Sequence, residues 1–193
     1  MKAADAISSG GVIAFRTDTF YGLGADPFDA SAVRRVRELK GRDDDKPILL
    51  LISDAEAVER VIVERSSEFQ IAAQNFWPGP LTIVGKAVKT LPEEITAGTG
   101  TVGVRLPADK TVRDLVRECG GVLTATSANP SGREPARSAE EVGAYFPSGL
   151  DLIVDGGEVS VTKPSTVLDI SSSPPRVVRE GTIPRNVIEQ LFA

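Results

Sequence analysis

Hydroxyl side chains gather at two places where an apolar run of the chain ends. The segment FRTDTFYGLGAD at 15–26 follows three apolar residues and places Thr17 and Thr19 on either side of an aspartate. The segment LTATSANPSG at 123–132 begins at the end of an apolar run and contains Thr126, Ser127 and Asn129. At strand ends of an α/β fold such groups suit a phosphate, ribose or amino-acid ligand, because they hydrogen-bond without adding charge. A turn that caps the next segment is the alternative interpretation of both.

Cations form a second group, beside a predicted helix end. Lys40, Arg42 and Lys46 lie at or after Gly41 in ELKGRDDDKP. A helix C-terminus favours a cation, which is sufficient to explain Lys40. Arg42 and Lys46 alternate with turn residues, a pattern that suits a polyphosphate. The aspartates at 43–45 are either magnesium ligands or residues of a solvated turn.

Arginine also occurs at the ends of two apolar runs. Arg105 closes TVGVR at 101–105, and Arg179 closes RVVR at 176–179, a few residues after Ser165. An arginine inside a strand pattern must either face outward or meet a carboxylate, and its planar fork suits the carboxylate of a substrate.

Composition narrows the chemistry that these residues could perform. The 193 residues include no histidine and one cysteine, Cys119, which excludes the commonest general base and a zinc cage. A net charge of −5 excludes a global positive field for nucleic acid and leaves room for a local basic site. The chain has no Walker loop, and Pro27 stands where a dinucleotide fingerprint requires its third glycine. Hydroxyls, lysines, arginines, carboxylates, backbone groups and magnesium remain.

The elements that must position these groups alternate between short apolar runs and amphipathic segments. This alternation predicts a mixed α/β fold, and a composition of 41% hydrophobic and 25% charged residues predicts a single domain over 1–193. Strands are predicted at 12–15, 48–52, 81–84, 102–106, 122–125, 152–154, 166–170 and 177–178. Helices are predicted at 3–8, 30–39, 55–63, 67–76, 111–119, 139–145 and 186–191. We expect the glycines of YGLG at 21–24 to turn the chain, so that Thr19 faces a pocket. No apolar stretch approaches the ~20 residues of a membrane span and no signal peptide is evident, so we expect a cytoplasmic protein without membrane contact.

Seven motifs in order closely resemble the YrdC-like domain of threonylcarbamoyl-AMP synthases. They are TDTFYGLGAD, ELKGRDDDKPI, FWPGPLTIV, TVGVRLP, TSANPSG, PSTVLDI and REGTI, and the resemblance covers about residues 5–183. It implies a twisted open sheet of parallel and antiparallel strands, flanked by helices, with a large concave cavity. It also implies synthesis of L-threonylcarbamoyladenylate and pyrophosphate from L-threonine, bicarbonate and ATP. The product would pass to the transferase machinery that makes threonylcarbamoyladenosine in tRNA.

The resemblance assigns roles residue by residue. It implies threonine contacts at Thr19, Arg105, Ala125 and Ser165. It implies ATP contacts at Lys40, Arg42, Lys46, Thr101, Ser127, Asn129, Pro135 and Arg179. Lys40, Arg42, Ser127 and Asn129 are the implied catalytic residues around the phosphates, and the metal ligands stay unassigned, with Mg²⁺ expected to be held through the ATP phosphates.

Four positions depart from the family pattern. Many relatives have proline at Arg16, histidine at Leu51, asparagine at Lys46 and serine at Pro135. Leu51 puts one contact of the threonine pocket in doubt, while Lys46 and Pro135 leave their ATP contacts to the backbone or to shifted positions.

Two other functions stay open at this point. YrdC-like domains have been proposed to bind double-stranded RNA or tRNA, although the acidic balance argues against strong binding. The domain also occurs in hydrogenase-maturation carbamoyltransferases, which form a carbamoyl adenylate. Those proteins carry zinc-finger-like segments, for which one cysteine is too few.

Overall fold

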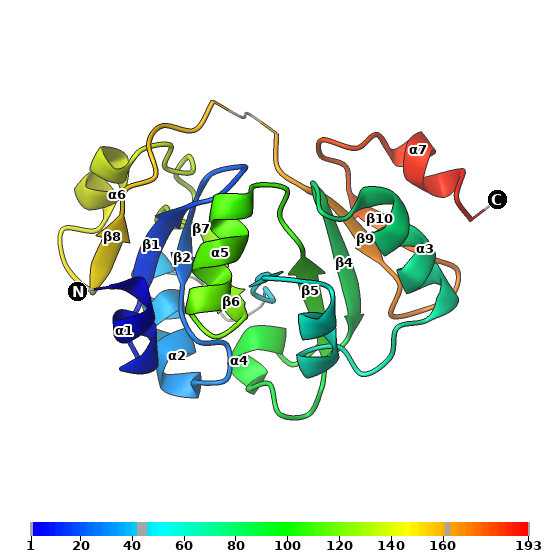
Figure 1. The fold of residues 1–193 in the computed structure, drawn as a ribbon, viewed down its shortest axis with the longest axis horizontal. Helices are drawn as coiled ribbons and strands as arrows, with labels where there is room; N and C mark the ends of the chain where they lie inside the picture. The colour runs from blue at the N-terminus through cyan, green and yellow to red at the C-terminus, as the bar shows by residue number, and fades with distance from the viewer. Residues whose placement is uncertain (1, 42–45, 161–162, 193) are drawn as a thin grey trace.

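Ten strands form two mixed sheets within residues 2–41, 46–160 and 163–192, the part of the chain that the computed structural model describes (Figure 1). The four-stranded sheet has the order β7(Thr126–Ser127), β2(Tyr21–Gly24), β1(Ile13–Arg16), β8(Leu152–Val154). The six-stranded sheet has the order β10(Arg176–Arg179), β9(Thr166–Asp169), β4(Leu81–Lys86), β5(Thr101–Arg105), β3(Leu50–Ile52), β6(Val122–Thr124). Both contain parallel and antiparallel pairs, which confirms the mixed α/β class. The division of the strands between two sheets is a feature that their order along the chain does not reveal.

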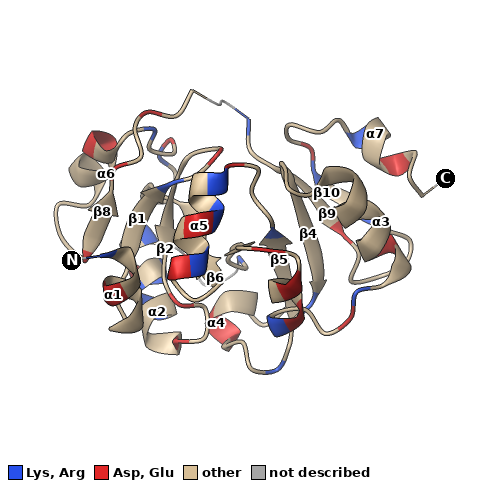
Figure 2. Ribbon diagram, in the orientation of Figure 1, with Lys and Arg blue, Asp and Glu red and all other residues tan. Residues whose placement is uncertain are grey.

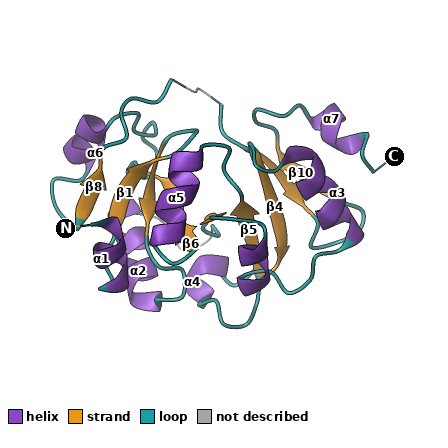
Figure 3. Cartoon of the chain, viewed as in Figure 1, coloured by secondary structure: helices purple, strands orange, loops and turns teal. Residues whose placement is uncertain are grey.

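Helices surround the strands (Figure 3). They are α1(Ala3–Ser8), α2(Ala30–Lys40), the 3-10 segment η1(Glu56–Arg60), α3(Ser67–Phe76), α4(Glu93–Thr96), α5(Lys110–Glu118), α6(Ala139–Tyr145) and α7(Arg185–Glu189). Helices α1 and α6 contact β1 and β8, whereas α3 contacts β4 and α5 contacts β3 and β6. In the described part of the chain, no helix has the length and apolar character that crossing a bilayer would take.

Capping residues fix both ends of α2, the helix that leads to the cationic segment. The Asp29 carboxylate accepts hydrogen bonds from the backbone N–H groups of Ser31, at 2.8 Å, and Ala32, at 3.2 Å. Such an N-cap satisfies donors that the first turn leaves unpaired. Gly41 ends the helix in the left-handed region, with φ of 56°, as the predicted stop requires.

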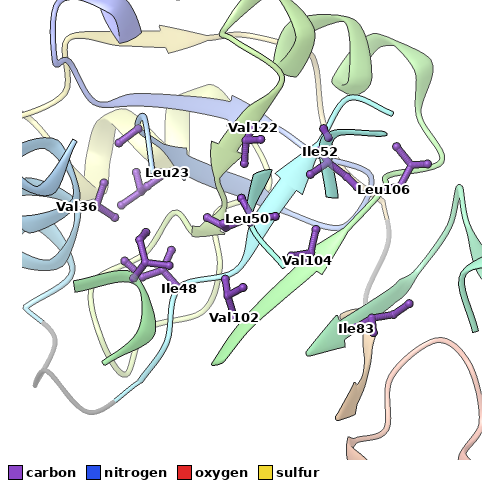
Figure 4. Packing of buried hydrophobic residues seen from close by; sticks show 14 of the residues in the cluster. Leu23, Val36, Ile48, Leu50, Ile52, Ile83, Val102, Val104, Leu106 and Val122 are labelled. Atoms are coloured by element: carbon purple, nitrogen blue, oxygen red, sulfur yellow. The ribbon is translucent and has the colours of Figure 1, made fainter. Parts of the chain in front are cut away.

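The main core lies where α2 meets strands of both sheets. Leu23 of β2, Val36 of α2 and Leu50 of β3 are fully buried and converge with Val104 and Val122 (Figure 4). A second cluster packs α1 and α5 against Ile13, Phe15 and Leu123, and it also contains Cys119. Burial raises the pKa of the Cys119 thiol to about 11, which fits the small core residue predicted from the sequence.

Residues 21–24 form a strand rather than the predicted turn. Strand β2 pairs antiparallel with β1, with Gly24 opposite Ile13, and Gly22 and Gly24 are not among the described glycines with positive φ. The glycine turn predicted here is therefore wrong. Close packing explains Gly24, because a Cβ at that position would lie 2.8 Å from Phe15 Cε1 and 2.9 Å from Leu123 Cδ2.

Gly24→Ala therefore tests this packing. We expect the added methyl to overpack the core and to lower the free energy of unfolding by about 1–3 kcal/mol, measured by urea denaturation. Gly143→Ala is the matched control, since its Cβ would meet only Ile153 Cδ1, at 3.9 Å, inside α6. A helical alanine there should be neutral or stabilise by up to ~1 kcal/mol. Equal stability of the two variants would contradict the packing role of Gly24.

Candidate functional site

A cavity of about 730 Å³ is lined by residues of both sheets. Residues of four adjacent strands of the six-stranded sheet form one wall: Thr82 and Val84, Thr101, Gly103 and Arg105, Val167 and Asp169, and Arg176, Val178 and Arg179. They alternate along β4, β5 and β9, whereas the register of β10 shifts between Val177 and Arg179. Their neighbours along the same strands, such as Ile83 and Val104, point into the core. Tyr21, Gly22, Thr126 and Ser127 of the four-stranded sheet contribute to the lining as well. The period of two along a strand thus separates a core face from a ligand face.

Most of the residues assigned to the site from the sequence line this cavity. They are Thr19, Thr101, Arg105, Ala125, Ser127, Pro135, Ser165 and Arg179. Lys40 and Asn129 are buried next to Ser127 and are outside the lining, and Lys46 is exposed and also outside it. Arg42 and the three aspartates at 43–45 lie outside the described residues.

Arg105 is a buried arginine at the end of β5. Its side chain is 2% exposed, and its Nη2 lies 2.9 Å from Oδ1 of Asp18. The second carboxylate oxygen of Asp18 accepts a hydrogen bond from the Ala108 backbone N–H at 3.3 Å. Of the two alternatives for an arginine in a strand, facing outward or meeting a carboxylate, the structure shows the second. Sequence reasoning did not identify Asp18, because the partner of Arg105 lies on a loop far away in the chain.

Two donors of Arg105 are left over. The buried Nε and Nη1 atoms have no hydrogen-bond partner among the described residues. Burial lowers the pKa of the Arg105 guanidinium, the Asp18 carboxylate opposes this shift, and the positive charge of Arg179 adds to it. Since a guanidinium stays protonated in proteins, the cavity keeps a fixed positive charge, and the N–H groups on these two nitrogens find no acceptor in the described part of the chain.

A tight turn held by Thr17 positions Thr19. The Thr17 hydroxyl donates to the Phe20 carbonyl at 2.6 Å and accepts from the backbone N–H groups of Thr19, at 3.1 Å, and Phe20, at 3.2 Å. The hydroxyls of Thr17 and Thr19 are 3.1 Å apart. Thr17, rather than the glycines of β2, makes the turn that presents Thr19 to the cavity.

A second ion pair fastens the residue before this turn. Arg16 Nη1 lies 2.8 Å from Oδ2 of Asp109, whose other oxygen caps α5 through the Thr111 N–H at 2.8 Å. Arg16, where many relatives have proline, therefore ties the end of β1 to the start of α5. The ion pairs of Arg16 with Asp109 and of Asp18 with Arg105 both connect the end of β1 and the turn after it to the segment from the end of β5 to the start of α5.

Lys40 holds the segment that contains Ser127 and Asn129. Its ammonium donates to the Asn129 carbonyl at 2.9 Å, to Asn129 Oδ1 at 3.2 Å and to the Ser127 hydroxyl at 3.4 Å. It also donates to the Ser127 carbonyl. Because the Lys40 side chain is only 4% exposed, the favourable interaction of a cation with a helix C-terminus is not sufficient to explain it. The geometry makes Lys40 a link between α2 and the hydroxyl-rich segment.

The last group joins Arg179, Ser165 and Thr82. Arg179 Nη2 donates to the Ser165 carbonyl at 2.9 Å, and the hydroxyls of Ser165 and Thr82 are 2.8 Å apart. Burial lowers the pKa of the Arg179 guanidinium. Thr82 was not identified from the sequence, although the alternation of β4 places it on the same face as Val84 and could have indicated it.

Leu51, another departure from the family pattern, does not reach the cavity. It is fully buried in β3 and packs with Ile13, Phe15 and Leu123 in the second core cluster. It is not among the described residues that line the cavity. At this position the chain contributes to the core instead of to a ligand site.

Comparisons with known proteins agree with this architecture. The model of the Sua5/YciO/YrdC family, described as Telomere recombination, matches residues 5–181. The threonylcarbamoyl-AMP synthase of Pyrococcus abyssi is 39% identical over 190 residues, which are 98% of this chain and 56% of that protein. The threonylcarbamoyl-AMP synthase of Halorhodospira halophila is 36% identical over 167 residues, which are 86% of this chain and 87% of that protein. The chain therefore spans about half the length of one relative and most of the other.

A comparison with a solved structure shows that the similarity extends to the three-dimensional fold. The crystal structure of P. abyssi Sua5 complexed with L-threonine superposes with a TM-score of 0.93 at 39% sequence identity. The match covers 99% of this chain and 56% of that one. The similarity thus extends through both sheets and the cavity between their strands.

Thr17→Val removes the hydroxyl that holds the turn and keeps the shape of the side chain. Loss of the acceptor for two backbone N–H groups should lower the free energy of unfolding by about 1–3 kcal/mol, measured by urea denaturation. Thr17→Ser keeps the hydroxyl and should cost less than about 1 kcal/mol for the lost methyl. A serine variant as unstable as the valine variant would show that the methyl, and not the hydrogen bonds, matters.

Proposed function

The chain belongs to the Sua5/YciO/YrdC family, and from this we propose that it forms L-threonylcarbamoyladenylate from L-threonine, bicarbonate and ATP, with release of pyrophosphate. The relatives that carry the name threonylcarbamoyl-AMP synthase support this activity, and so does the threonine complex of the P. abyssi protein. The proposal concerns an enzyme of the nucleotidyltransferase type.

The observation that carries the proposal is the buried guanidinium of Arg105 at the cavity wall. Its positive charge suits an amino-acid carboxylate, and the unpartnered Nη1 can donate to one oxygen of that group. Thr19, Ala125 and Ser165 line the same cavity and complete the proposed threonine site. The carboxylate of a bound amino acid would pair with a guanidinium that is already removed from water in the free protein.

The proposed ATP site takes the remaining part of the cavity. Thr101, Ser127, Pro135 and Arg179 line it, and Lys40 orients Ser127 and Asn129 through the hydrogen bonds described above. We propose that Arg42 and Lys46 add positive charge near the phosphates. A volume of about 730 Å³ lies in the upper part of the range of about 300–1,000 Å³ for small-molecule sites, as two substrates bound together require.

The chemistry asks mainly for positioning. The threonine amine and bicarbonate form a carbamate, an oxygen of the carbamate attacks the α-phosphorus of ATP, and pyrophosphate leaves in line. Phosphoryl and nucleotidyl transfer of this kind depends on alignment and on neutralising charge rather than on a histidine base. In this chain, which has no histidine, arginines and hydroxyls can align the substrates and neutralise their charge.

We propose that magnesium enters this site with the nucleotide. The described residues contain no group of three or more His, Cys, Asp or Glu side chains placed to hold a metal ion. The Ser127 hydroxyl lines the cavity and offers a neutral oxygen of a kind that magnesium accepts, so we propose that the ATP phosphates hold Mg²⁺ beside it. The ion would offset charge on the phosphates.

The proposal also covers the fate of the adenylate product and any contact of the protein with tRNA. We propose that the adenylate passes, in the cytoplasm, to the transferase machinery that modifies tRNA. Lysines and arginines alternate with acidic residues, for example along α5 (Figure 2), and the net charge is −5. This distribution supports at most a weak, salt-sensitive contact with tRNA itself.

One assay tests the activity. Purified protein with ATP and Mg²⁺ should release pyrophosphate and form the adenylate only when both threonine and bicarbonate are added. Omission of either substrate from buffer freed of carbon dioxide is the control. Release that ignores both additions would contradict the proposed function.

Two variants test the division of the cavity. Arg105→Ala should raise the KM for threonine by about 10- to 100-fold, because a charge-assisted hydrogen bond contributes about 1.5–3 kcal/mol. Arg42→Ala should instead raise the KM for ATP. Circular dichroism and thermal melting check that both variants fold. Equal effects of either variant on both substrates would show that the assignment of the two halves is wrong.

A further inference from the structure

A buried pair of hydroxyls lies in the cavity wall beside the expected substrates. Thr82 Oγ1 of β4 and Ser165 Oγ, directly before β9, are 2.8 Å apart, and each residue is 4% exposed. The parallel pairing of β4 with β9 brings them together, since Leu81 lies opposite Thr166. Gly103 keeps the wall open next to them, because a Cβ there would lie 3.2 Å from Thr82 Cγ2. Nothing in the proposed threonine and ATP sites gives Thr82 a role.

Counting protons shows that this pair has a donor to spare. Two hydroxyls carry two protons, and the hydrogen bond between them uses one. Arg179 Nη2 lies 3.4 Å from Ser165 Oγ and acts there as a further donor. One hydroxyl proton of the pair therefore has no acceptor among the described residues. A buried donor left without an acceptor is unfavourable, and an oxygen of a ligand would satisfy it.

The charges around the pair favour an anion. Arg179 is exposed and has no carboxylate within 4.0 Å among the described residues, unlike Arg105, which has Asp18. The charge of Arg179 also acts on Arg105, and both arginines line the cavity, which Glu134 and Asp169 line as well. Neither of these two carboxylates lies within 4.0 Å of Arg179. A ligand with a negative charge and several oxygen acceptors complements this arrangement.

We propose that the hydroxyls of Thr82 and Ser165, together with Arg179, bind bicarbonate and then the carboxylate of the carbamate made from it. This inference rests on the proposed function, in which bicarbonate is the one substrate without assigned residues. Ser165 is expected on the threonine side and Arg179 on the ATP side, so their meeting point is where the carbamate must form. The threonine nitrogen forms a bond to the bicarbonate carbon, the C–OH bond breaks, and hydroxide leaves as water with a proton from the amine.

Thr82→Val tests the subsite because valine keeps the shape of threonine and lacks the hydroxyl. Initial rates of pyrophosphate release are measured in buffer freed of carbon dioxide, with bicarbonate varied at saturating threonine and ATP. We expect the KM for bicarbonate to rise by about tenfold or more and the KM values for threonine and ATP to change by less than about twofold. Thr82→Ser, which restores a hydroxyl, should recover most of the affinity for bicarbonate.

The outcomes separate this inference from the proposed function. Wild-type release that depends on threonine and bicarbonate supports the function whatever the variants do, and its absence refutes the function. With the function intact, an unchanged KM for bicarbonate in Thr82→Val would overturn the subsite. So would a rise confined to the KM for threonine, which would assign the hydroxyl to the amino acid. If the valine variant does not fold in a thermal melt, Thr82→Ala takes its place with the same expectations.

Discussion

The ion pair between Arg105 and Asp18 is the interaction on which the cavity depends. A guanidinium that is 2% exposed loses most of its hydration, and the Asp18 carboxylate compensates only one side of it. Asp18 in turn is held by the Ala108 N–H, and the neighbouring pair of Arg16 with Asp109 fixes the same loops. The position of the Thr17–Phe20 turn therefore follows from the need to compensate a buried charge. The two remaining donors of Arg105 are what the cavity offers to a ligand.

Strand alternation explains how a small chain builds both a core and a polar cavity. Three adjacent strands of one sheet, β9, β4 and β5, send every second side chain into the core and the others into the cavity. The core side is aliphatic, as at Ile83, while the cavity side carries Thr82 and Arg105. The same backbone hydrogen bonds that stabilise the sheet thus set the spacing between hydroxyls and guanidinium groups, which side chains on mobile loops could not do.

Local patterns in the sequence predicted local structure well. The bounds of α1, α3 and α6 agree with the prediction, and so does the helix stop at Gly41, because caps and amphipathic periods are local signals. Strand β2 was missed because glycine usually marks turns, while at Gly24 it makes room for Phe15 and Leu123 from distant parts of the chain. The division into two sheets, the partner of Arg105 and the hydroxyl of Thr82 all depend on contacts between distant segments. Most of the residues that the ordered motifs assigned to a site line the cavity, yet no single motif contains the pairing that holds them in place.

Titration of the protein with L-threonine and with L-threoninol, in the presence of a non-hydrolysable ATP analogue, tests the role of Arg105 most directly. Threoninol keeps the amine and the side chain and replaces the carboxylate by an alcohol, so it cannot pair with the free donors of the guanidinium. Calorimetry should give an affinity for threoninol at least about tenfold weaker, as expected for loss of a charge-assisted hydrogen bond. Equal affinities would show that Arg105 does not bind the carboxylate and that its burial serves the fold alone.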